Sequence, residues 1–180
     1  MQRILETVGA SMLKRTVGVA VAASFLVLSP TSFAGPKGTD RPMKGECDAT
    51  FVEETPPTPP LFIQTLSIYL ECHLTHLGST TGTATQFVDY GARNGNPPFT
   101  PPFIITNTIE YIAANGDKLY ARFAGAGVPD GPGNVAFSGM TTYVGGTGRF
   151  SAATGLSADT GGASLITNEG FFSVNGRISY

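Results

Sequence analysis

Glycine and proline interrupt this chain so often that no amphipathic helix of useful length fits between them. The 180 residues include 23 glycines and 13 prolines, and only 13% of the residues are charged. Because glycine and proline form turns and end helices, this spacing favours short strands joined by turns. The 41% of hydrophobic residues is too high for a disordered protein, and the low charge is untypical of coiled coils and nucleic-acid-binding surfaces.

Residues 1–34 have the pattern of a secretory signal peptide, which predicts a cleaved N-terminal helix. Arg3 and Lys14-Arg15 supply positive charge, Thr16–Leu28 is an uncharged apolar run, and Ser32-Phe33-Ala34 offers small residues before a cut. The run of 13 residues is shorter than the ~20 that a transmembrane helix requires. We therefore expect cleavage after Ala34 and export to the periplasm or the medium; a permanently anchored helix is the alternative.

Cleavage would leave an acidic chain with two cysteines. The loss of Glu6 and of three basic residues leaves 8 basic and 12 acidic residues, so DNA, RNA and anionic lipid are not expected partners. Export also leads to an oxidising compartment, which favours a disulfide between Cys47 and Cys72. Such a bridge would be worth roughly 3 kcal/mol in the chain-entropy model.

Residues 35–60 are predicted to form a flexible N-terminal arm and a proline-rich connector, with a short strand starting near Cys47 and reaching Val52. The tract Thr55–Pro60 is polyproline-like and cannot join a ladder of strands. A stiff loop is the expected role of this tract, and a PxxP ligand for another domain is the alternative.

Residues 61–180 are predicted to form an antiparallel β-barrel. The clearest period-2 alternation runs from Leu66 to His76, and Asn115-Gly116 is the strongest hairpin signal, typical of a type I′ turn. Further strands are expected over 83–90, 103–114, 118–124, 134–144, 163–167 and 171–180, with loops over 94–102 and 125–133 and a compact corner over 150–155 that opens another strand. Seven to eight strands without helices predict an all-β fold, a single antiparallel eight-stranded barrel.

The stretch Tyr143–Phe150 (YVGGTGRF), followed by Ala153 and Gly155, resembles the strand, GGTGxF, xxAxG, strand signature of the allene oxide cyclase and dirigent-like barrels. The resemblance extends over 134–180 and more weakly over 66–124, where it also includes exported bacterial proteins of unknown role. It implies a calycin-like eight-stranded barrel that is often a homo-oligomer. In plant members the lumen takes an apolar substrate, either a fatty-acid epoxide or phenoxy radicals.

The same motif has a structural meaning that is independent of function. Its glycines permit a tight reversal, its aromatic residue is expected to plug one end of the barrel, and its small residues let the next strand approach closely. The residues of this turn motif are Gly145, Gly146, Gly148, Phe150 and Gly155. The signature therefore transfers the fold better than the activity, and no catalytic residue is carried over.

No metal, cofactor or hydrolase site is predicted. His73 and His76 are the only histidines, and a spacing of three on a strand places them on opposite faces, with His76 inside the barrel. The chain lacks a G-x-S-x-G motif, and Gly145–Gly148 lacks the lysine of a phosphate-binding loop.

The barrel lumen is the remaining candidate site. Four polar residues are expected among its apolar side chains: His76, Asn107, Tyr111 and Tyr143. An apolar cavity with few polar groups is typical of a small-ligand site, so non-catalytic binding of a small apolar ligand is the expected function. Three alternatives remain open: a cyclase- or dirigent-like enzyme, a structural barrel whose side chains fill its interior, and a small outer-membrane barrel.

Overall fold

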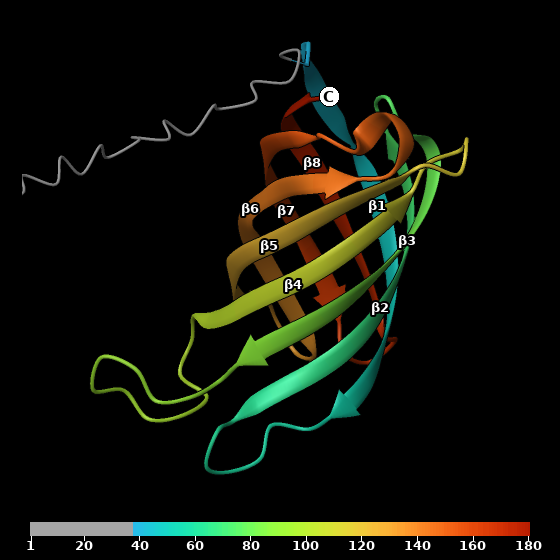
Figure 1. Cartoon of the computed structure of the whole chain (residues 1–180). Coiled ribbons are helices and arrows are strands. Elements are labelled where there is room, and N and C mark those ends of the chain that lie inside the picture. The colour runs from blue at the N-terminus through green and yellow to red at the C-terminus, as the bar shows by residue number, and fades with distance from the viewer. Residues whose placement is uncertain (1–37) are drawn as a thin grey trace, which may run out of the picture. The chain divides into compact units, whose positions relative to one another are not determined.

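The protein is an eight-stranded antiparallel β-barrel, as the sequence predicts (Figure 1). The computed structural model describes residues 38–180, so the predicted signal peptide lies outside the described residues. Within 38–180, no helix is long and apolar enough to cross a membrane. The strands are β1 (Asp40–Thr55), β2 (Ile63–Leu74), β3 (Gly78–Asp89), β4 (Phe103–Ile112), β5 (Lys118–Pro129), β6 (Asn134–Gly146), β7 (Thr154–Ser164) and β8 (Glu169–Ser179).

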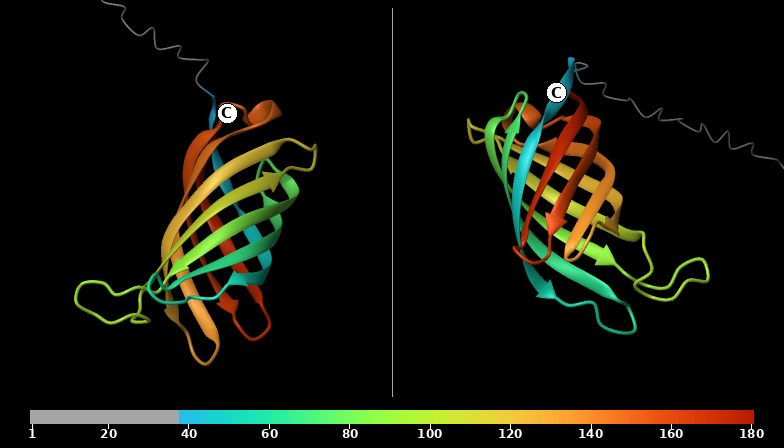
Figure 2. Two further views of the ribbon diagram at one scale, coloured as in Figure 1. Left: turned by 60° about the horizontal axis from the view of Figure 1, so that its bottom comes forward. Right: turned by 180° about the vertical axis from the view of Figure 1, so that it is seen from behind.

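Each strand pairs with the next, and β8 pairs back with β1 to close the barrel. Alternate residues face the interior: in β2, for example, Leu66, Leu70 and Cys72 are buried while Tyr69 and His73 are exposed. The two ends of the barrel differ, as all three views show (Figure 2). One end carries the longer loops over 56–62 and 90–102 and is called the mouth; the other carries the short 3₁₀ helix η1 (Gly148–Phe150) and is called the plugged end.

The first barrel strand begins earlier than the sequence analysis expects. Residues 40–55 were predicted to belong mostly to a flexible arm, yet they form β1, which pairs with β8 over Asp40–Thr50 and with β2 over Gly45–Thr55. Polar and glycine residues hide the alternation in the sequence, but Met43 and Cys47 point inward and are almost fully buried. The connector is correspondingly shorter, from 56 to 62.

Two local predictions around β5 are also corrected. Residues 125–129 were predicted to be a loop, but they continue β5 to Pro129 and pair with β6. The hairpin before β5 does turn at Asn115-Gly116, yet Gly116 alone has a left-handed φ, of +86°. The amide of Gly116 donates to the carbonyl of Ala113, which fits a type I turn followed by a left-handed glycine rather than a type I′ turn.

The predicted disulfide is confirmed. Cys47 and Cys72 lie directly opposite each other on β1 and β2, with Cα atoms 4.1 Å apart. Both side chains point into the barrel and are almost fully buried. The bridge fixes the register of the first two strands.

The turn motif closes the plugged end. Phe150 is fully buried, its ring lies 4.9 Å from that of Tyr180, and Leu77 and Leu119 are buried at the same end. Gly148 has a φ of +52°, and a side chain there would overlap the carboxylate of Asp117. These contacts leave the mouth as the open end of the barrel.

Candidate functional site

Side chains fill the lumen over only part of its length. Toward the plugged end its interior is packed with side chains, while toward the mouth it opens into a cavity of about 100 Å³, called here the cup. Aliphatic and aromatic side chains line most of it: Ala49, Phe51, Leu66, Ile68, Leu70, Ala84, Val88, Tyr90, Phe103, Ile105, Ile109, Val135, Phe137, Ala163, Leu165, Phe171 and Phe172. The cup is therefore an apolar site with a single open end.

Aromatic residues from the long loop gather at the rim of the cup. The Tyr90 ring lies 4.6 Å from the ring of Phe103 and 5.4 Å from that of Phe99, and Phe99 contacts Phe62 of the other loop edge to face at 5.5 Å. The Tyr90 hydroxyl donates to Oε1 of Gln64 at 2.8 Å. These contacts join the 56–62 and 90–102 loops to the strands and hold the rim in place.

The deepest part of the cup has a polar floor. A pocket of about 30 Å³ continues inward from it and is lined by Gln86, Asn107 and Asp159 among three phenylalanines and two isoleucines. Asn107 Oδ1 is buried there without a hydrogen-bond partner. A buried unpaired acceptor costs roughly 1–3 kcal/mol, so this atom is a candidate contact for a ligand.

Asp159 is the most unusual group of the floor. Its side chain is 2% exposed, and among residues 38–180 it takes part in no ion pair. Thr141 donates to Oδ2 at 2.6 Å and Ser157 donates to Oδ1 at 2.8 Å, while the Tyr143 hydroxyl donates to Ser157 at 3.0 Å. Two hydroxyl donors thus replace a cationic partner.

Burial dominates the electrostatics of this cluster. Desolvation raises the pKa of Asp159, although the hydrogen bonds from Thr141 and Ser157 oppose the increase. Desolvation likewise raises the pKa of Tyr143 and of the fully buried Tyr111, and the Asp159 charge raises both further. The carboxyl group is therefore harder to ionise here than in water.

The sequence of β7 explains how an aspartate fits inside the barrel. The inward positions of β7 are all small or polar: Gly155, Ser157, Asp159, Gly161 and Ala163. Asp159 lies opposite Gly139 of β6, where the ring of Phe123 occupies the space that a side chain at position 139 would take. Because these small and polar residues alternate with Leu156 and Ala158, the period-2 pattern would assign Asp159 to the outer face, and nothing in the sequence marks it as inward.

The four predicted lumen residues do not form one site. Asn107 lies in the floor, whereas Tyr143 reaches the floor only through Ser157. Tyr111 is 1% exposed and lines neither the cup nor the pocket beneath it. His76 lies in the turn after β2, which ends at Leu74; it has a φ of +71°, its ring lies 6.2 Å from that of Tyr180, and it lines neither the cup nor the pocket beneath it. His73 faces solvent, as predicted.

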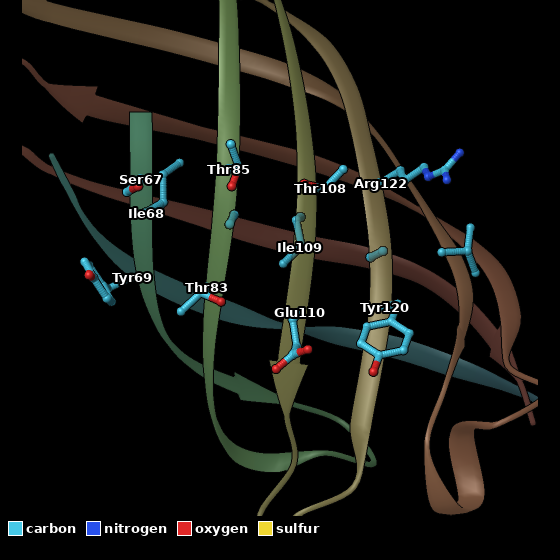
Figure 3. A pocket seen from close by; sticks show the side chains of 13 residues that line it. Ser67, Ile68, Tyr69, Thr83, Thr85, Thr108, Ile109, Glu110, Tyr120 and Arg122 are labelled. Carbon is cyan, nitrogen blue, oxygen red and sulfur yellow. The ribbon is translucent and has the colours of Figure 1, made fainter. Parts of the chain in front are cut away.

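A larger hollow of about 550 Å³ lies on the outer face of β2–β5 (Figure 3). Tyr69 and Tyr120 stand at its two sides, with Thr83 and Glu110 between them. Glu110 is already paired with Lys118 at 2.8 Å. Since this hollow is more open than the cup, the smaller cup is the stronger candidate for a small ligand.

Comparison with known proteins gives no match: no family model, curated protein or solved structure is significantly similar to this chain. Within 38–180, no three histidine, cysteine, aspartate or glutamate side chains are grouped as metal ligands. The function is therefore argued from the cup itself.

Proposed function

We propose that the protein binds a small apolar ligand in the cup. The observation that carries this proposal is the enclosed, aromatic-lined cavity with an unpaired polar atom at its floor. Binding sites for small molecules combine these two features, since apolar walls supply affinity and a few polar groups fix orientation.

The size of the cup limits the ligand. Its volume of about 100 Å³ is below the ~150 Å³ of an engineered apolar cavity that takes up benzene. A ligand held here is therefore narrow, such as an alkyl chain, and its outer part contacts the aromatic rim formed by Tyr90 and Phe103.

The compartment in which the protein works is part of the same proposal. The disulfide between Cys47 and Cys72 is compatible with an oxidising environment. Together with the signal-like pattern of residues 1–34, it supports export to the periplasm or the medium.

The first experiment uses the absence of tryptophan from the chain. Phe51→Trp places one emitting side chain on the wall of the cup, and titration with 1-hexanol is expected to give a saturable change in its emission. Adding Ala49→Phe should abolish the change by filling the cup. Adding Ala124→Phe, on the exposed outer side of β5, should leave it intact. Absence of saturable binding, or equal loss in both variants, would refute the proposal.

A second measurement searches for the natural ligand. Native mass spectrometry of protein purified from its host should show a co-purifying lipid-like mass that is lost in the Ala49→Phe variant. A bare protein mass would count against binding in the host.

The buried carboxyl group also favours a second candidate, an acid–base catalyst acting on an apolar substrate, as the cyclase-like signature implies. A carboxyl group with a raised pKa keeps its proton to a higher pH than an ordinary aspartate, and Asp159 lies at the end of an apolar cavity. The test is incubation with an allylic fatty-acid epoxide: turnover that Asp159→Asn abolishes would support catalysis, and its absence would leave the binding proposal alone.

A further inference from the structure

The floor of the cup contains hydrogen-bond acceptors with free capacity. Asn107 Oδ1 has no partner, and each Asp159 oxygen receives one hydroxyl donor while a carboxylate oxygen can accept two. Thr141 and Ser157 already donate to Asp159, while the amide NH2 groups of Gln86 and Asn107 also line the floor. A ligand that satisfies Asn107 Oδ1 and the remaining acceptor sites of Asp159 brings donors of its own.

The floor is also negatively charged whenever Asp159 is ionised. Nothing among residues 38–180 forms an ion pair with that charge, and the titratable groups on which the Asp159 charge acts are the hydroxyls of Tyr143 and Tyr111, which carry no positive charge. An unpaired charge in an apolar interior is costly, and a cation with hydrogen-bond donors removes most of that cost. A carboxylate at the same place would be repelled.

The space at the floor is small. A volume of about 30 Å³ exceeds the ~10–15 Å³ that one water molecule requires, but it cannot hold a bulky charged group beside the rings of Phe123, Phe137 and Phe172. A primary ammonium group fits this volume and carries three donors, whereas a quaternary ammonium is larger and carries none.

We propose that the ligand of the cup is a primary alkylamine, whose ammonium group enters first and donates hydrogen bonds to Asp159 and to Asn107 Oδ1 while its alkyl chain lies among the aromatic side chains. This inference rests on the proposed function and specifies the ligand class for the same site.

The test uses the Phe51→Trp protein and four probes with the same six-carbon chain: hexylamine, 1-hexanol, hexanoate and hexyltrimethylammonium. Hexylamine is expected to bind about tenfold more tightly than 1-hexanol, since hydrogen bonds to a charged group are worth roughly 1.5–3 kcal/mol. Hexanoate and hexyltrimethylammonium should bind more weakly than 1-hexanol.

Asp159→Asn should remove the advantage of hexylamine and change the affinity for 1-hexanol by less than about twofold. Asp48→Asn is the matched control, because Asp48 is an exposed carboxylate on the outer face of β1, and it should change neither affinity. Should Asp159→Asn not fold, Asn107→Leu is the second variant and should weaken hexylamine binding more than 1-hexanol binding.

The outcomes separate the two proposals. Binding of no probe would refute the ligand-binding function itself. Equal affinities for hexylamine and 1-hexanol, or a preference for hexanoate, would refute the amine while preserving the apolar cup. Equal loss of hexylamine binding in Asp159→Asn and Asp48→Asn would show general attraction to an acidic protein and would also refute it.

Discussion

Asp159 holds its carboxyl group among phenylalanine rings, and this burial links the stability of the barrel to pH. Desolvation raises the folded-state pKa of Asp159 above the ordinary value of 3.8. The unfolded chain keeps the ordinary value, so at pH values between 3.8 and the folded-state pKa the folded chain binds more protons at this site than the unfolded chain does. The contribution of Asp159 to the free energy of unfolding therefore falls as the pH rises from about 3.8 through the folded-state pKa.

This fall in stability with rising pH gives a prediction for Asp159→Asn. An asparagine does not titrate, so the variant lacks the loss of stability that ionisation of Asp159 causes at higher pH. Relative to the wild type, the variant should be more stable at pH 7 than at pH 3.5. Urea denaturation of both proteins at the two pH values measures the difference. A difference in stability that is independent of pH would contradict the raised pKa.

Two adjacent glycines in β7 offer a matched pair of substitutions. A Cβ at Gly161 would overlap the carbonyl oxygen of Phe171 in β8, whereas one at Gly162 would meet its nearest atoms at an ordinary 3.5 Å. Gly161→Ala should therefore destabilise the fold by about 1–3 kcal/mol. Gly162→Ala should be neutral or stabilise it by up to about 1 kcal/mol. Urea midpoints test both, and equal effects would contradict the close approach of β7 to β8.

The disulfide is expected to stabilise the pairing of β1 with β2. The bridge closes a loop with a sequence separation of 25 residues, so replacing both cysteines with alanine should cost roughly 3–4 kcal/mol of stability. Reduction of the wild type should lower its urea midpoint toward that of the double variant and leave the double variant unchanged. Free thiols in unfolded, unreduced wild type would contradict the pairing.

The elements that the sequence predicts best are those whose alternation is uninterrupted. Leu66 to Leu74 alternates strictly, so the strand and the inward direction of Cys72 follow from the period alone. The first part of β1 and the end of β5 are missed because glycine and proline are ordinarily turn residues. In β5, Gly125 is required instead by close contact, since a Cβ there would lie 2.6 Å from the ring of Phe123.

The candidate site is less predictable from sequence than the fold. Asn107 is found because it interrupts an apolar strand face, but Asp159 is one acidic residue without a visible partner. Its role depends on which strands flank β7 and on Gly139 lying opposite, and these facts become known only when the barrel is closed. The sequence places His76 on the inner face of a strand, but β2 ends at Leu74 and His76 lies in the following turn.

The outer surface of the whole barrel carries charge on several strands, among them Glu71 on β2, Glu110 on β4 and Arg122 on β5. A single arginine at the midplane of a bilayer costs a membrane barrel about 2–4 kcal/mol. We therefore expect the protein in the detergent-free fraction after cell disruption. Its recovery only in a salt-washed membrane pellet would support the outer-membrane alternative.

Gly38 and Tyr180 meet at the plugged end, where the Ser179 hydroxyl donates to the Gly38 carbonyl at 2.6 Å and the Tyr180 ring lies on Phe150. Both ends of the described chain thus lie far from the mouth (Figure 1). A sensor surface coupled through residue 180 would present every molecule with its mouth toward the solution. Immobilised protein should therefore keep its full binding capacity, without a tether crossing the entrance.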